Sequence, residues 1–248
     1  MKTLTITLVI IIAALTSTVA ARDITYIWES NLLSEYVAPS GIMAHDDWIW
    51  QNSATIVDPS GAYINVWHSG SADHHWLDDE NGWATETDYA LGYAGPLWDT
   101  GLNIDILVSY WGLEQQFDDS ADMIFSLVKL SKSFQINKAQ SITAYVKGAN
   151  YTLTGGSSKD NGNIIVIGLG HSLKVNNLLT VNSELNAIEK WRVFGTEDNE
   201  IFTASTYLAW KIGEKVTVKL PSLALYFPNK KEDVKNEFVF GTGIVVNF

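Results

Sequence analysis

The amino-acid sequence predicts an all-β fold, namely a closed antiparallel transmembrane β-barrel of twelve strands. Apolar and polar residues alternate along most of the chain, and the spacing typical of a helix is almost absent. The alternating segments have about 10–14 residues, and a tilted strand needs about 9–11 residues to cross a bilayer. Short turns alternate with long polar connections, which is the arrangement of outer-membrane barrels.

The first 21 of the 248 residues have the features of a secretory signal peptide. Lys2 supplies a positive charge, an apolar stretch runs from Leu4 to Leu15, and small residues allow cleavage after Ala20 or Ala21. The apolar stretch is shorter than the roughly 20 residues of a membrane-spanning helix. The sequence therefore predicts an exported protein in which residues 22–248 form one barrel domain.

Composition excludes several classes of protein. Without the leader, which holds one lysine, the chain has 15 basic and 28 acidic residues and a net charge of −13. This sign disfavours nucleic acid as a partner, because binding phosphates requires basic residues. The absence of cysteine excludes disulfides and thiolate metal ligands. After the leader, no apolar run approaches the roughly 18 residues of a membrane helix.

The pattern places twelve strands along the chain. They are 24–37, 47–57, 62–71, 85–97, 102–114, 122–134, 140–153, 162–174, 178–191, 200–212, 215–227 and 237–248. The connections 58–61, 98–101, 175–177 and 213–214 are short and contain tight-turn residues. The connections 38–46, 71–84, 115–121, 154–161, 192–199 and 228–236 are longer and polar. The connection 135–139 is longer than this pattern predicts, so the strand count stays open around residues 122–153.

The last strand indicates which face of the barrel points to lipid. Phe240, Ile244 and Phe248 share its apolar face, and the chain ends on Phe248. A terminal aromatic residue on an amphipathic strand resembles the signal that the barrel-assembly machinery reads in bacterial outer-membrane proteins. We therefore expect outer-membrane lipid and this machinery as partners, the outer membrane of a Gram-negative bacterium as the location, and Phe248 at the rim of the short turns.

Three stretches resemble those of one known family. Ser34–Val37 (SEYV) followed by Gly41 resembles the opening of TorF-type porins, Gly61–Trp67 (GAYINVW) resembles their third strand, and Glu86–Tyr89 (ETDY) resembles their acidic fourth strand. The resemblance covers roughly residues 30–115. An arginine that usually precedes the first glycine of the family is replaced here by Ala, Pro and Ser at 38–40. The resemblance implies an outer-membrane barrel with pore function, and it supplies no substrate.

Charged residues are the candidates for a functional site. Seven are expected to line the lumen: Glu86, Asp88, Asp105, Lys147, Glu184, Lys211 and Lys219. Mixed charges of this kind line an aqueous path or pair across it and close it. Acidic residues also gather at the rim of the long connections: Asp73, Asp78, Asp79, Glu80, Asp118 and Asp119. Rim carboxylates attract cations within about 8–10 Å at ordinary salt, so any pore is expected to prefer cations.

Metal binding and catalysis find little support in the sequence. His and carboxylate residues cluster at 45–47 and 73–80, but no spacing there imposes a coordination geometry, so solvated polar loops are the favoured interpretation. Neither a metal nor another cofactor is predicted. The motifs of a nucleophile elbow, a zinc protease and a phosphate loop are missing. His171 and Ser172 are adjacent, and neighbouring strand residues face opposite sides, so the chain is not predicted to be an enzyme.

Three functions remain open from the sequence. The leading hypothesis is a channel that passively conducts small hydrophilic solutes or ions. The alternative is a non-conducting structural or binding barrel whose acidic extracellular loops face a partner. A barrel enzyme that acts on lipid is the third, and a Ser–His pair exposed at mid-wall would favour it.

Overall fold

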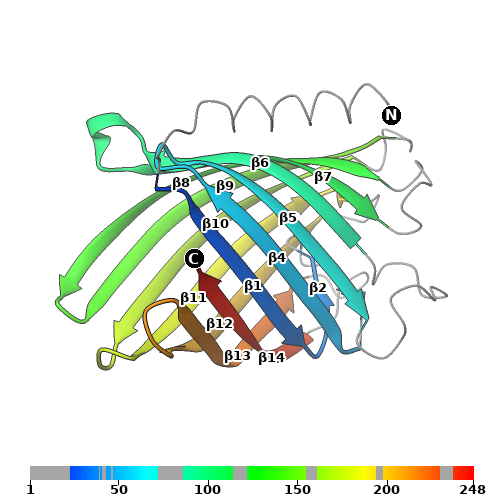
Figure 1. Ribbon diagram of the computed structural model, residues 1–248. Helices are drawn as coiled ribbons and strands as arrows, with labels where there is room; N and C mark the ends of the chain where they lie inside the picture. Colours follow the sequence, from blue (N-terminus) through cyan, green and yellow to red (C-terminus); the bar gives the residue numbers. More distant parts are fainter. Residues whose placement is uncertain are drawn as a thin grey trace.

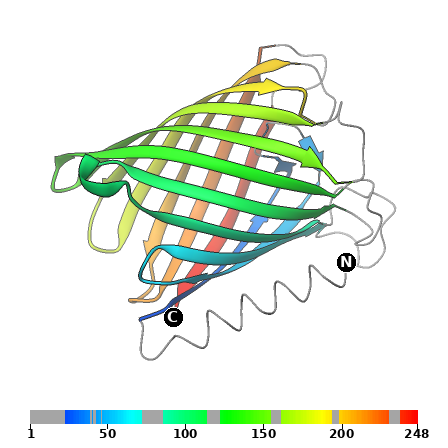
Figure 2. The same cartoon turned by 90° about the horizontal axis from the view of Figure 1, so that it is seen from above.

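The computed structural model describes residues 23–38, 40, 43–45, 47–71, 86–113, 122–154, 161–193, 198–229 and 237–248. Twelve strands form one closed antiparallel barrel (Figures 1 and 2). They are β1 (Thr25–Leu33), β4 (Ile49–Val57), β5 (Ala62–Ser71), β6 (Glu86–Pro96), β7 (Asn103–Leu113), β8 (Met123–Asn137), β9 (Gln140–Leu153), β10 (Gly162–Lys174), β11 (Leu179–Trp191), β12 (Asn199–Lys211), β13 (Val216–Pro228) and β14 (Glu237–Asn247). The predicted fold class is therefore confirmed. The expected leader, residues 1–21, lies outside the described residues.

Each barrel strand pairs with its neighbours in the chain, and β1 pairs with β14 to close the ring. The register of this seam runs from Ile27 opposite Asn247 to Leu33 opposite Gly241. Beyond the last paired residue, the amide of Phe248 donates a hydrogen bond to the carbonyl of Tyr26 at 2.9 Å. Phe248 thus lies at the rim of the short turns, beside the first residues of β1 (Figure 1).

The structure corrects the predicted first strand, 24–37. β1 ends at Leu33, because Leu33 already lies opposite Ile49, the first residue of β4. Residues beyond it have no partner in that ladder, and the chain instead forms a small hairpin of β2 (Tyr36–Val37) and β3 (Met43–His45). The sequence pattern did not predict this hairpin. Its first strand lies in the end of the predicted strand 24–37, and its second strand lies in the predicted connection 38–46.

The region around 122–153 contains two strands, so the count of twelve holds. β8 continues to Asn137, and only residues 138–139 separate it from β9. Phe134 and Ile136 continue the alternation of exposed apolar side chains to this end. Asn137 closes the turn by accepting a hydrogen bond from the amide of Ala139 at 2.8 Å. The expected longer connection at 135–139 is therefore wrong.

The outer wall of the barrel is apolar and carries aromatic residues toward both rims. Exposed aromatics near the strand ends that meet the short turns are Tyr26, Trp28, Tyr93, Phe134, Trp210 and Phe248. Exposed aromatics near the other ends are Trp48, Trp50, Tyr89, Phe202, Phe227, Phe238 and Phe240. Two such girdles around an apolar band are typical of barrels that span the outer membrane. Among the described residues, no helix is long and apolar enough to cross a membrane.

One irregularity interrupts the ladder between β13 and its neighbours. The register shifts between Lys219 and Ser222 against β14, and between Tyr207 and Ala209 on the β12 side. Pro221 lies in this bulge, and proline is excluded from regular ladder positions because it has no amide hydrogen to donate. The bulge lets Lys219 face the barrel interior together with Tyr207.

The alternation along β10 generates a test of which face meets lipid. Val166 is 1% exposed and lines the interior, whereas Ile167 is 65% exposed on the outer wall. The natural chain has no cysteine, so Val166→Cys and Ile167→Cys each provide one thiol. In vesicles, a maleimide confined to the membrane should label the cysteine at 167 and leave the one at 166 unlabelled. Labelling at 166 alone would mean that the two faces are reversed.

Candidate functional site: the barrel interior

The barrel encloses a cavity of about 650 Å³. Residues of the β2 segment and of every barrel strand except β1 and β14 line it, and they include hydroxyl, amide, charged and aromatic side chains. The lining residues are Tyr36, Val37, Ala38, Gln51, Thr55, Tyr63, Asn65, Trp67, Asp88, Ala90, Leu107, Ser109, Trp111, Phe125, Lys147, Val166, Asn186, Ile188, Thr203 and Tyr226. A cavity of this size with convergent polar groups is the expected form of a small-molecule site or path.

The β2 segment places one aromatic side chain inside the barrel. Tyr36 is 8% exposed, and its hydroxyl donates a hydrogen bond to Glu86 Oε2 at 3.1 Å. Its ring packs against Trp67, with 5.7 Å between the ring centroids. Burial raises the pKa of Tyr36 well above its usual value, and the Glu86 and Asp88 carboxylates add to this. The phenol therefore remains a neutral donor.

An apolar cluster fills the interior on the side of β7 to β12. Trp111, Phe125 and Tyr151 stack on one another with centroid distances of 4.8, 5.6 and 4.9 Å. Buried aliphatic residues from the same half of the wall surround them: Met123, Ile164, Val166, Ile188, Val193 and Ile201. Most of these cluster residues lie near the ends of their strands that are joined by the long connections. The interior is thus apolar on this side and polar on the side of β4 to β6.

Two tyrosines cross over a glycine to reach a carboxylate two strands away. Tyr63 of β5 lies over Gly92 of β6 and donates to Asp105 of β7 at 2.9 Å. Tyr145 of β9 lies over Gly168 of β10 and donates to Glu184 of β11 at 2.7 Å. A Cβ at Gly168 would lie 2.2 Å from the Tyr145 ring, so a larger residue there would displace it. Both glycines are therefore part of the geometry that holds the lumen acids.

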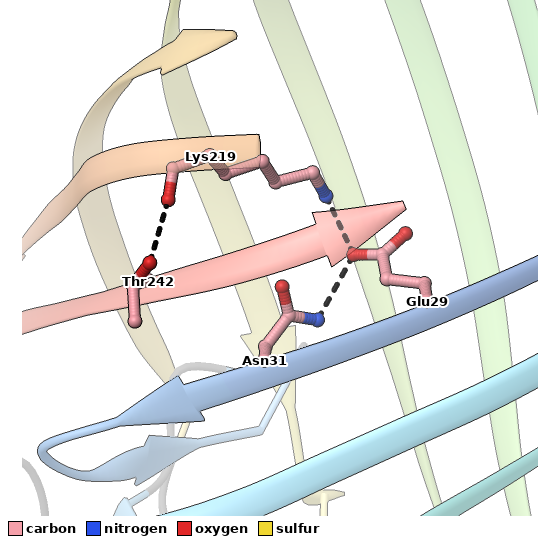
Figure 3. A network of polar contacts seen from close by, with 4 residues as sticks. All are labelled: Glu29, Asn31, Lys219 and Thr242. Atoms are coloured by element: carbon pink, nitrogen blue, oxygen red, sulfur yellow. Dashed lines mark hydrogen bonds and ion pairs between the residues drawn. The ribbon is translucent and has the colours of Figure 1, made fainter. Parts of the chain in front are cut away.

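An ion pair lies behind the closing seam. Lys219 Nζ of β13 lies 2.5 Å from Glu29 Oε1 of β1, so the pair reaches across β14 (Figure 3). Asn31 donates to the same carboxylate oxygen at 2.9 Å. Thr242 of β14 donates its hydroxyl to the carbonyl of Lys219 at 3.0 Å. Side-chain contacts thus join β13, β14 and β1 at the seam, in addition to the backbone hydrogen bonds between these strands.

The predicted lumen residues occupy different environments. Asp88 and Lys147 line the cavity, Glu86 is 2% exposed beside Tyr36, and Asp105 and Glu184 accept from tyrosines. Lys219 forms the ion pair with Glu29. Lys211 is exposed at the short-turn end of β12, apart from the cavity. The predicted acidic rim residues Asp73, Asp78, Asp79, Glu80, Asp118 and Asp119 lie outside the described residues.

Sequence reasoning missed two charged residues of the interior. Glu29 and Lys129 both face inward, and Lys129 Nζ lies 4.1 Å from the centre of the Tyr145 ring. Lys129 and Lys147 are register partners on β8 and β9. Strand alternation alone would have found Lys129, because Val128 and Leu130 flank it, whereas Glu29 lies between Trp28 and Ser30 and gives a weaker signal.

His171 and Ser172 belong to opposite faces of β10, as their adjacency predicts. The register instead places His171 opposite Ser183 of β11, and both belong to the outer face. Ser183 pairs with the Thr206 hydroxyl at 3.0 Å, and within the described chain no hydrogen bond joins it to His171. A serine nucleophile needs a base within hydrogen-bond reach, so this pair does not support a lipid-acting enzyme.

Comparison with solved structures shows which known proteins share this fold. No family model matches this sequence, and no curated protein matches it. The solved KdgM porin superposes with a TM-score of 0.54 at 9% identity, covering 90% of this chain and 99% of that chain. The NanC porin gives 0.53 at 10% identity over 89% and 98%. The COG4313 outer membrane channel from Pseudomonas putida F1 gives 0.51 at 10% identity over 91% and 94%. The chain has the fold of these porins and channels.

The Glu29–Lys219 pair can be tested by a double-mutant cycle. Both side chains are less than a third exposed, so Glu29→Gln and Lys219→Met should each destabilise the barrel by about 1 kcal/mol. The double variant should lose less than the sum of the two, because it leaves no charge unpaired. Urea unfolding in lipid vesicles measures all four proteins. Additive losses would show that the two charges do not interact.

Proposed function

We propose that this protein is an outer-membrane channel that passively conducts small hydrophilic solutes. The observation that carries the proposal is a cavity of about 650 Å³ inside a closed barrel whose outer wall is apolar. Polar and charged side chains such as Asp88, Lys147 and Asn186 are among its lining residues. An apolar outer wall is stable against lipid, and polar groups in the lumen favour water and dissolved solutes. The likeness to porin structures supports the same reading at the level of the fold.

Features of the sequence support export and insertion. The predicted leader at 1–21 directs the chain out of the cytoplasm, and Phe248 at the end of β14 provides the terminal signal for barrel assembly. The stretches that resemble TorF-type porins also meet in space, since Tyr36 contacts both Trp67 and Glu86 inside the barrel. The resemblance of these stretches is the basis for proposing that family.

The lumen favours neutral or cationic solutes over polyanions. The KdgM porin has been solved in complex with oligogalacturonate, which is a polyanion. In the described strands of this chain, carboxylates at 86, 88, 105 and 184 face the interior beside the lysines at 129 and 147. A polyanion would meet these carboxylates, and like charges in a narrow lumen repel it.

A non-conducting barrel is the second candidate. Tyr36 and the apolar cluster around Trp111 occupy much of the interior near the long connections. Such packing in a twelve-stranded barrel narrows any path, because diameter grows with strand number. Conductance decides between the two candidates.

The first test is single-channel recording in planar bilayers with the refolded barrel. The natural protein should give discrete conductance steps, and Tyr36→Ala should increase the step size, because it removes a ring from the lumen. Tyr89→Ala, on the outer face of β6, is the control and should leave the step size unchanged. If folded protein and Tyr36→Ala are both silent, the protein is a structural or binding barrel.

The second test concerns ion selectivity. Acidic residues outnumber basic ones in the predicted rim, so a potassium chloride gradient should give a reversal potential of cation preference. The preference should fall as the salt concentration rises, because salt screens rim charges. Glu184→Gln should weaken the preference, and the outer-face variant Glu200→Gln should change it less. Anion preference would contradict the proposal.

A further inference from the structure

The polar side of the interior contains a continuous row of oxygen-bearing side chains. Gln51 of β4 lies opposite Ser69 of β5, and Ser69 lies opposite Glu86 of β6. All three side chains are buried, with 8%, 0% and 2% exposure. Asp88 follows two residues after Glu86, on the same face of β6. Directly opposed residues have Cβ atoms about 4.5–5.5 Å apart, so Ser69 lies between Gln51 and Glu86. Asp88 is opposite Trp67, diagonal to Ser69, and the longer Gln51, Glu86 and Asp88 side chains can converge on the Ser69 hydroxyl.

These donors are not satisfied by the protein. Glu86 Oε1, Asp88 Oδ1 and Ser69 Oγ are buried and have no hydrogen-bond partner in the described part of the chain. Glu86 uses its other oxygen to accept from Tyr36. Glu86 and Asp88 are two residues apart on the same face of β6, which places their carboxyl groups near each other. Two neighbouring buried carboxylates repel unless a proton or a cation lies between them.

Protein cations do not resolve this repulsion. The ion pair of Lys219 with Glu29 lies at the seam on β13 and β1, and neither Glu86 nor Asp88 has an ion pair among the described residues. A buried, unpaired charge is expensive, whereas a buried hydroxyl such as that of Ser69 costs less but still needs a partner. One bound cation would satisfy both carboxylates and the hydroxyl together.

We propose that Glu86, Asp88, Ser69 and Gln51 bind a calcium ion inside the barrel. All donors are oxygens, which hard cations prefer, and none is a nitrogen or a thiolate. Calcium accepts six to eight oxygens in flexible geometry, whereas magnesium demands a near-ideal octahedron. Asp88 and Gln51 line the cavity, so the ion and its remaining water ligands reach the site from the lumen.

The donor set predicts weak binding. In the described chain no group of three or more His, Cys, Asp or Glu residues is arranged to hold a metal, and this site has two acidic ligands completed by neutral oxygens. Few charged ligands give calcium dissociation constants on the order of 10⁻⁴ M or weaker. Because Glu86 also holds Tyr36, the ion links β6 to the β2 hairpin. The proposal does not depend on conduction.

Terbium luminescence tests the site in the folded, detergent-solubilised full barrel. Terbium(III) replaces calcium at oxygen sites, and Trp67 and Tyr36 are close enough to sensitise its emission. We expect saturable emission that millimolar calcium chloride displaces. Glu86→Gln and Asp88→Asn should each weaken the terbium affinity at least tenfold, and Ser69→Ala should weaken it two- to fivefold.

Matched controls separate this site from other carboxylates. Asp105→Asn and Glu184→Gln remove lumen acids that tyrosines already satisfy, and both should retain the natural affinity. Circular dichroism and heat-dependent gel mobility confirm that each variant is folded. If Glu86→Gln and Asp88→Asn bind terbium like the natural protein, or if calcium displaces no emission, the carboxyl pair shares a proton and the calcium site is rejected.

Discussion

The need to satisfy every backbone amide and carbonyl governs this structure. In hydrocarbon no water is available to replace a missing ladder hydrogen bond, so a sheet is stable there only if it has no open edge. The seam between β1 and β14 meets this need with pairs from Ile27–Asn247 to Leu33–Gly241. Closure then fixes the alternation of side chains between lipid and lumen in all twelve strands.

The lumen is organised by side chains that reach across strands. Tyr63 and Tyr145 each pass a glycine on the intervening strand and meet an acid on the strand after it. Lys219 lies opposite Gly243 of β14 and reaches Glu29 on β1, the next strand. Glycine makes this path available because it leaves no side chain in the way. Asp105, Glu184 and Glu29 are thereby held against the wall. On the β4–β6 side Glu86 accepts instead from Tyr36 of β2 through one oxygen, and its other oxygen and Asp88 Oδ1 have no hydrogen-bond partner among the described residues.

Local sequence patterns were enough to predict the strands. Alternation and turn length placed all twelve within a few residues, and Phe248 fixed which face is outward. Other features depend on contacts that no local pattern contains. The contact of Tyr36 with Glu86 joins residues fifty positions apart, and the end of β1 is set by where β4 begins. The bulge beside Pro221 sets the face on which Lys219 lies, and no local pattern predicts its partner Glu29 on β1. Lys211 lies opposite Thr217, on the inward face that alternation predicts, but at the short-turn end and apart from the cavity.

The order of the strands also has a kinetic consequence. Every pairing in the barrel joins neighbours in the chain except the seam, which joins residues about 220 positions apart. Closing a loop of that length costs about 3–4 kcal/mol more in chain entropy than closing a four-residue turn. Hairpins, including the pairing of β1 with β4, can therefore form one after another while the other edge of β1 stays open until β14 is present. A chain that stops before β14 keeps two open edges and is prone to aggregate, so completing the ladder is also a check that the last strand has been made.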